Sequence, residues 1–587
     1  MAEDSQTLRQ IHWRELFPFL HLFRAFRVAI HPSKLFLGLL LVLLLYLGGR
    51  VLDAIWPTAY CTTAGEIDRY SAYQTGRNPT ESFETTSESL RQERIEQYAA
   101  LLRSEGLRTD RDSALEAARH GELYGDLQRH IIQHRNEAID KANAAAEKSK
   151  TDIDNNKNLT EAERKLEYRR IADTRESEIQ KAQRQAAAQI EELSRLAPRR
   201  IFAEFMDYEA RQFQAIREAA LTGNWLGGMS FGGSRAMADM SAMMAENALA
   251  RNRTSSMPVS FGPVSVVQGL VNFAVLGPGW MVHYHFGYFI LYAAWFLLVW
   301  AVFGGAIARI AAVDVSRDET ISVRQALRFS TSKVVSFIFA PLIPLIIILI
   351  AGLVIAAGGL LLWIKVIGPI IVGAFFILAL LAGFVMTLVV ALTAGGFNVM
   401  YPTIAVEGTD SFDAISRSFS YVVGRPWKML FYTVISLIYG SITFVFCRYF
   451  IFVMLSLTHF FAGWFLGGRP ARYWPEIWPP VSDQSLPYDI VFPALAWSEK
   501  IAAGLISFWI YIILGLLAGF VVSFYFSSNT IIYLLIRREV DAAEMDDVYL
   551  EETDDDFSEA SVATSAESAP NVETATPPTA PAPDAAP

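Results

Sequence analysis

The stretch from Val334 to Gly395 is nearly unbroken in apolar side chains and carries a single charge, that of Lys365. One transmembrane helix needs about 20 apolar residues, so this stretch is too long for one span and long enough for two. Gly368 and Pro369 follow Lys365 closely, and we expect them to form the turn of a membrane hairpin. Backbone groups in a bilayer core must hydrogen-bond internally, which predicts that both spans are helices.

Four further apolar segments have the length of a membrane span. The chain has 587 residues, of which 52% are hydrophobic, and these residues are concentrated in long runs rather than spread as in a soluble domain. The sequence therefore predicts an all-α, polytopic helical membrane protein with about six spans. The four segments are 35–56, 286–307, 429–457 and 501–535.

Between the first and second spans, residues 57–283 contain no segment that is long and apolar enough to cross a membrane. A helix at 122–154 is followed by a second long helix, which opens with Thr160 and Glu163 at the spacing of a capping box. The apolar positions of the two helices are mostly Ala and Ile, too sparse for a sustained leucine heptad. We expect a coiled-coil-like helical arm outside the membrane, with 85–220 as the part that binds a protein partner.

The two ends of the chain differ from its apolar middle. Residues 1–34 combine aromatic and basic side chains at helical spacing, which favours an amphipathic helix lying in the membrane interface. An ordinary packed amphipathic helix is the alternative. Residues 537–587 are first acidic and then rich in Ala and Pro, so we expect a disordered tail.

Basic residues indicate how the five-span region 284–536 is oriented. Lys and Arg gather in its amphipathic inserts 309–333 and 398–428, and also flank the first span on its N-terminal side. In short loops, Lys and Arg favour the cytoplasmic side of a membrane. We therefore expect a multi-pass protein of the inner (cytoplasmic) membrane, with both termini in the cytoplasm and the region 57–283 on the opposite side.

No pattern in the sequence favours a metal, a cofactor or a nucleic acid. Four methionines at 237–244 recur at helical spacing, which is more typical of a packing surface than of a copper site. His283 and His285 lie among aromatic residues typical of a membrane interface. The glycine-rich segment 227–233 lacks a phosphate-loop pattern, and the two cysteines lie too far apart in sequence to suggest a disulfide framework.

The two inserts resemble each other, because each has an acidic turn followed by a short amphipathic helix that leads into a span. Residues 402–408 (PTIAVEG), with 424–427 (GRPW), resemble a broad group of bacterial multi-pass proteins. This group includes the membrane domain attached to some glycerophosphodiester phosphodiesterases. Segments 304–309 and 531–538 are similar to others of that architecture. The resemblance implies a helical membrane domain; phosphodiesterase activity is not implied, since no catalytic domain is evident.

Two functions remain in competition, and a membrane enzyme has less support because no catalytic motif stands at an interface. The first is a non-catalytic membrane scaffold that contacts the lipid bilayer, binds a partner through its arm and can form homo-oligomers. The second is a transporter or channel within 284–536, since a charge inside a span can mark a substrate path. Arg448 is the main such charge, although it can also extend toward the membrane surface. The candidate functional residues are Arg448, Arg309, Arg417 and Arg425.

Overall fold

The computed structural model describes most of the chain, and this part is almost entirely helical. No strand occurs in it, and one isolated antiparallel bridge joins Thr62 to Arg199. The prediction of an all-α fold is therefore confirmed. The glycine-rich segment 227–233 and the methionines at 237–244 lie outside the described residues, which are 17–57, 61–74, 83–155, 160–224, 265–466, 474–475, 477–481 and 497–549.

Within the described residues, six helical segments are long and apolar enough to cross a membrane, as the sequence predicts. The chain is thus a multi-pass membrane protein whose outward apolar side chains contact lipid. The second segment comprises α13 (Phe286–Val299), η4 (Trp300–Gly304) and α14 (Gly305–Arg317), and the third comprises α16 (Val334–Gly359) and η5 (Leu360–Trp363). The others are α3 (Pro32–Ile55), α17 (Ile367–Glu407), α19 (Pro426–Gly463) and α21 (Trp497–Val540).

The hairpin of α16 and α17 turns at a different place from the one expected. Its helices are interrupted at 364–366, where Val366 has a φ of 69°, and Gly368 and Pro369 already lie in the first turn of α17. Proline is tolerated there because the first amides of a helix have no partner inside the helix. The turn therefore forms before the two residues that were expected to make it.

Both amphipathic inserts also start later than expected, because the preceding helices are longer. α14 continues to Arg317 and α17 continues through Pro402 to Glu407. Each helix is followed by a residue of left-handed conformation, Asp318 or Gly408, and then by a short capped helix. These short helices are α15 (Val323–Ser332), capped by Ser322, and α18 (Ser411–Gly424), capped by Asp410.

The membrane domain consists of three successive units of the same form. In each unit a short amphipathic helix leads into one span, and a second span returns to the same end. The first unit begins with η1 (Pro18–Phe23) and α2 (Arg24–Ala29). The units are α2, α3 and α13–α14; then α15, α16 and α17; then α18, α19 and α21.

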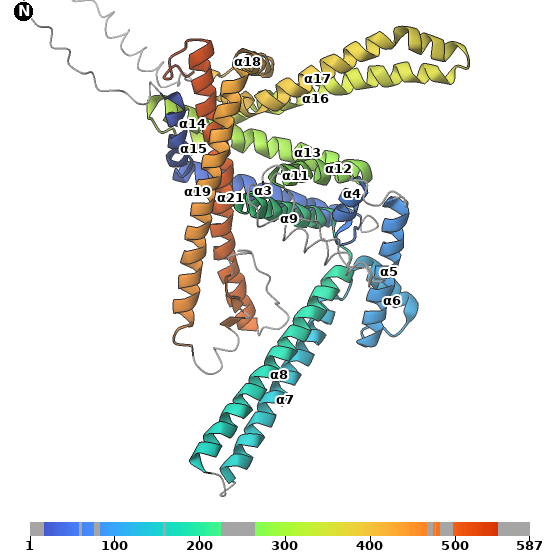
Figure 1. Cartoon of the computed structure of the whole chain (residues 1–587), viewed down its shortest axis with the longest axis vertical. Helices are drawn as coiled ribbons and strands as arrows, with labels where there is room; N and C mark the ends of the chain where they lie inside the picture. Colours follow the sequence, from blue (N-terminus) through green and yellow to red (C-terminus); the bar gives the residue numbers. More distant parts are fainter. Residues whose placement is uncertain are drawn as a thin grey trace, which may run out of the picture.

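The returning spans α14, α17 and α21 pack against one another at one end of the molecule, which we call the hub. Each short amphipathic helix packs against the returning span of another unit, α15 on α14, α18 on α17 and α2 on α21. The three helical hairpins diverge from the hub (Figure 1). The outer parts of α16 and α17 therefore expose most of their apolar side chains.

The chain ends pack more closely on the protein than their composition suggests. Leu22, Ala25, Val28 and Ala29 are buried in the core of the hub, so the described part of 1–34 has one face against protein. The placement of this segment in the membrane interface stays a prediction. At the other end, α21 includes the first residues of the predicted tail, and Val548 beyond it is also buried in the hub.

The region between the first two spans forms a helical domain with a long protruding hairpin, which we call the arm (Figure 1). The arm consists of α7 (Tyr124–Asn155) and α8 (Glu161–Leu196), and the capping box of Thr160 and Glu163 is present as expected. Around its root lie α4 (Glu66–Gln74), α5 (Phe83–Ser104), α6 (Arg111–His120), α9 (Ile201–Leu221), α11 (Val266–Val271), η3 (Asn272–Leu276) and α12 (Gly277–Tyr284).

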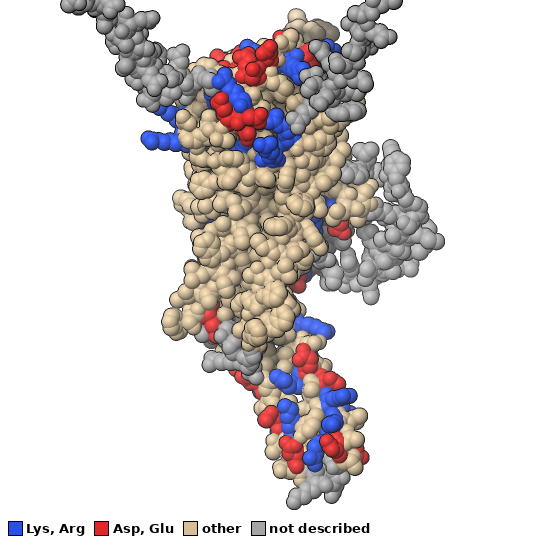
Figure 2. Space-filling view, turned by 90° about the vertical axis from the view of Figure 1, so that its left-hand side faces the viewer, with Lys and Arg blue, Asp and Glu red and all other residues tan. Residues whose placement is uncertain are grey.

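Charged side chains are distributed unevenly over the surface. Figure 2 shows a broad apolar zone between charges at the hub end and charges along the arm. An apolar belt between two polar zones is what a bilayer requires of a spanning protein. In this view the charged arm and the charged hub end lie on opposite sides of the apolar zone.

Helices α3 and α21 cross at two glycines, Gly38 and Gly519. A Cβ atom added to Gly38 would stand 2.5 Å from the backbone oxygen of Gly519, and one added to Gly519 would stand 2.7 Å from the amide nitrogen of Leu39. Backbone atoms cannot move aside as a flexible side chain can.

We predict that Gly519→Val separates α3 from α21 and destabilises the protein by about 2 kcal/mol or more, measured as the melting temperature in detergent. Gly504→Val, where a Cβ meets nothing within 4 Å, is the matched control.

Candidate functional site

Two polar clusters lie at opposite ends of the membrane helices. The hub cluster is centred on Glu407, the last residue of α17, whose side chain is 8% exposed. Its carboxylate binds Arg417 of α18 at 2.8 Å and Arg537 of α21 at 3.2 Å, and accepts a hydrogen bond of 2.5 Å from Tyr533. One carboxylate thus joins three helices, and both of its oxygens have partners. This arrangement is typical of a structural ion-pair network.

Arg309 of α14 belongs to the same cluster and is 4% exposed. Its guanidinium donates hydrogen bonds to the backbone oxygen of Ala405 at 2.8 Å and to that of Tyr549 at 2.5 Å. Its central carbon lies 4.4 Å from the centre of the Phe329 ring. Arg309 therefore holds α14, α15, α17 and the segment after α21 together, with its charge satisfied by carbonyl groups and an aromatic face.

The other two predicted arginines do not join the hub cluster. Arg425 is exposed at the N-terminal end of α19. Arg448 lies on the same helix, half-buried, and 20 residues after Lys428. At a rise of about 1.5 Å per residue, this separation corresponds to roughly 30 Å along the helix. The structure thus brings Arg309 and Arg417 together and leaves Arg425 and Arg448 apart from them.

Sequence reasoning missed two lysine–carboxylate pairs that close the first and third units. Lys34, in the first turn of α3, bonds to Asp314 of α14 at 2.6 Å. Lys428, in the first turn of α19, bonds to Glu539 of α21 at the same distance. In both units the lysine follows a proline by two residues, at 31–34 (HPSK) and 425–428 (RPWK). This recurring Pro-x-Lys pattern was the signal that could have revealed them.

The second polar cluster, the arm-root cluster, begins with Asp53 near the end of α3. Asp53 is 3% exposed and accepts hydrogen bonds from the amides of Phe202 at 3.0 Å and Ala203 at 3.2 Å. These amides open α9, whose own N-cap residue, Arg200, provides no side-chain bond. The hydroxyl of Tyr288 donates a third bond of 3.0 Å. Asp53 thus caps a helix that begins about 150 residues further along the chain.

Glu204 lies one turn into α9 and is fully buried. Its Oε1 accepts a bond of 3.1 Å from the amide of Glu66, and its Oε2 lies 3.5 Å from the guanidinium of Arg199. Burial raises the pKa of Glu204 to about 7, partly opposed by Arg199 and Arg211. A second bond across this junction runs from the Trp280 indole to Glu66 at 3.3 Å. The cluster thus connects α4, α9 and α12 through polar contacts.

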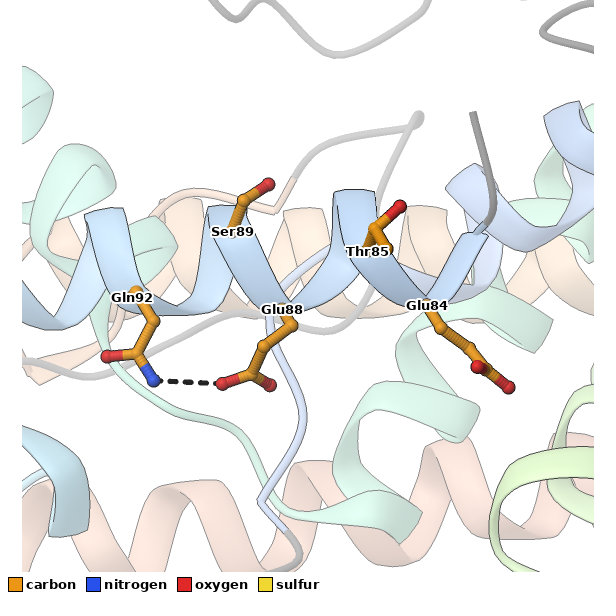
Figure 3. A pocket seen from close by; sticks show the side chains of 5 residues that line it. All are labelled: Glu84, Thr85, Glu88, Ser89 and Gln92. Carbon is orange, nitrogen blue, oxygen red and sulfur yellow. Dashed lines mark hydrogen bonds between the residues drawn. The ribbon is translucent and has the colours of Figure 1, made fainter. Parts of the chain in front are cut away.

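A surface hollow of about 480 Å³ on α5 offers no site for chemistry. It is lined by one helix, and Figure 3 shows Thr85 and Ser89 pointing away from Glu84 and Glu88. Glu88 accepts a bond of 2.8 Å from Gln92 of the same helix. Among the described residues, no group of three or more His, Cys, Asp or Glu side chains is placed to hold a metal ion.

We predict that Lys34→Ala destabilises the protein far more than Lys428→Ala. The side chain of Lys34 is fully buried and its removal leaves Asp314 without its cation, at a cost of about 3 kcal/mol. The Lys428 side chain is 52% exposed, so loss of its pair should cost less than about 1 kcal/mol. Thermal unfolding of both variants in detergent measures the difference. Equal losses would contradict this account of the first unit.

We predict that Asp53→Ala loosens α9 without unfolding the membrane helices. The substitution removes the acceptor of two helix amides and of the Tyr288 hydroxyl, which should cost roughly 2 kcal/mol locally. Hydrogen exchange of the amides in the first turn of α9 measures this effect. Asp53→Asn keeps one acceptor oxygen and should fall between the alanine variant and the unaltered protein.

Comparison with known proteins identified no relative of this chain. No protein-family model matches the chain, and neither does any curated protein or solved structure. The resemblance to bacterial multi-pass membrane domains therefore stays a prediction.

Proposed function

We propose that this protein is a non-catalytic scaffold of the bacterial cytoplasmic membrane that holds a helical arm on the outer side. The observation that supports this most directly is the capping of α9 by Asp53, because it fixes the returning end of the arm to a membrane span. The hub and both termini would then face the cytoplasm, in agreement with the basic residues of the inserts.

A second set of contacts holds the arm at its root. The backbones of Thr62 and Arg199 exchange two hydrogen bonds, of 2.8 and 2.9 Å. The guanidinium of Arg200 donates a bond of 3.0 Å to the backbone oxygen of Trp56, directly after α3. The segment before α4 and the segment between α8 and α9 are therefore bonded to each other, and the second is bonded to the end of a span, which fixes the chain where it leaves the arm.

The arm itself has the dimensions and surface of a binding element. Its helices have 32 and 36 residues, which correspond to lengths of about 50 Å. Their shared seam is thin and includes the buried Ala146, Ala182 and Ala186, so most of each helix remains exposed. Leu166, near the far end, is 60% exposed. A single exposed leucine is common on protein surfaces, so the length and the exposed faces of the arm carry the proposal, and Leu166 is the apolar position at which to test it.

The alternative, a transporter or channel, has weaker support. The buried polar residues of α21 bond mainly to backbone oxygens, as Ser523 does to Ala29 at 2.8 Å and Thr530 does to Phe526 at 2.8 Å. Bonds of this kind are typical of packed membrane helices. Arg448 remains the residue on which a transport proposal would rest.

Shortening the arm tests the scaffold proposal while preserving its root. Asn143 and Arg175 are bonded across the two helices at 2.7 Å, so residues 144–174 can be replaced by a short Gly-Ser turn in register. We expect proteins that co-purify with the intact chain to be lost, with membrane insertion and melting temperature unchanged. Leu166→Glu in the full-length arm should cause the same loss, and Lys165→Glu, at an exposed position beside it, should not.

An unchanged set of co-purifying proteins after the shortening would overturn the proposal. Uptake or conductance in proteoliposomes that is lost in Arg448→Ala at normal expression would favour the transporter instead.

A further inference from the structure

Glu209 of α9 is a buried carboxyl group that belongs to neither the hub cluster nor the arm-root cluster. It is 7% exposed, and among the described residues neither of its carboxyl oxygens has a hydrogen-bond partner. Its Oε1 lies against Gly277, the first residue of α12, where an added Cβ atom would stand 2.1 Å from that oxygen. The carboxyl group therefore fits into a space that exists only because residue 277 has no side chain.

The helices that face Glu209 offer it no charge. From 266 to 282, the segments α11, η3 and α12 contain no acidic or basic residue. The nearby polar contacts are between amides: Gln268 donates to Asn272 at 3.0 Å, and Asn272 donates to Gln212 at 3.2 Å. An ionised carboxylate in this position would be unpaired, which is costly in a buried site.

The charged groups on the neighbouring elements have other partners. On α3, Asp53 caps α9, and on α9 itself Glu204 and Arg211 face Asp68 of α4 and Arg199. The other charged groups on these elements are Lys34 and Arg50 of α3, Glu66 and Arg69 of α4, Asp207, Arg217 and Glu218 of α9, and His283 at the end of α12, which bonds to Gly279. Among the described residues none of them forms an ion pair with Glu209. Burial alone raises the pKa of Glu209, to about 8.

The backbone beside Glu209 is also irregular. Residues Asn272–Leu276 form a π-helical segment between α11 and α12, directly before Gly277. Segments of this kind interrupt the regular helical bonding and are often found at functional sites. The contact between α9 and α12 therefore lies directly after a segment whose helical hydrogen bonding is already irregular.

We propose that Glu209 is a proton-binding site that latches α9 to α11 and α12. The protonated carboxyl group is accepted in the space over Gly277, and release of its proton to water leaves an anion that separates α9 from these helices. Since α9 directly follows the arm, the latch makes the arm root respond to the pH of the compartment around it. This last step rests on the proposed function of the arm; the proton site itself does not.

The sign of the effect follows from linkage. The closed state binds a proton more tightly than the open state, so closing is favoured at low pH and is weakened as pH rises from the ordinary carboxyl pKa of 4.5 to about 8. Within that window each pH unit lowers the equilibrium constant for closing by up to about tenfold, and above about pH 8 the constant levels off because both states have lost the proton. Glu204, whose pKa is about 7, adds a slope that ends near pH 7 and that Glu209→Gln leaves in place.

The test uses the full-length protein in lipid nanodiscs. Hydrogen exchange of the amides at 266–281, corrected for intrinsic rates, is followed from about pH 6 to about pH 9.5, together with the infrared carbonyl band of a protonated carboxylic acid. We expect protection in the unaltered protein to fall as pH rises toward about 8 and then to level off. In Glu209→Gln protection should be constant above about pH 7, and the acid band assigned to Glu209 should be absent.

Two outcomes would overturn the latch. One is a pH dependence in Glu209→Gln equal to that of the unaltered protein, and the other is an unaltered protein with neither an acid band nor a loss of protection. Glu218→Gln, at an exposed position of the same helix, is the matched control and should behave as the unaltered protein does. These measurements do not involve an arm partner, so failure of the scaffold proposal would leave their outcome unchanged.

Discussion

The packing of α14, α17 and α21 at one end of the bundle is the constraint on which the rest of the membrane domain depends. Each of these returning spans ends at the hub in an acidic residue that bonds to a cation of another helix, namely Asp314, Glu407 and Glu539. The helices are therefore fixed to one another where they leave the apolar zone, and their hairpins diverge beyond it (Figure 1). These ion pairs thus lie at the hub, where they hold the three returning spans in position.

The three units are equivalent in form but not in detail. The first and third units are closed by a lysine in the first turn of one span and a carboxylate in the last turns of the other. In the second unit Glu407 instead binds Arg417 and Arg537, which belong to the third unit. The acidic residue near the end of the returning span thus bonds within its own unit in the first and third units, and bonds to the neighbouring unit in the second.

Much of the fold was predictable from sequence because it depends on local patterns. Apolar runs of sufficient length identify the six spans, and a capping box marks the start of α8. The contacts that assemble these helices were not predictable in the same way. Lys34 and Asp314 are 280 residues apart, and Asp53 and Phe202 are 149 apart, so no local periodicity relates them.

The arm leaves the membrane domain and returns to it at adjacent points, since Thr62 and Arg199 are paired across its base. The region between these residues, which contains α4, α5, α6 and the arm, is therefore a loop whose two ends are held together. The entropic cost of closing such a loop grows only slowly with its length. Residues could therefore be gained or lost within the arm over evolution at little cost to the membrane bundle. The length of the arm is thus a property that natural selection could adjust independently of the fold that carries it.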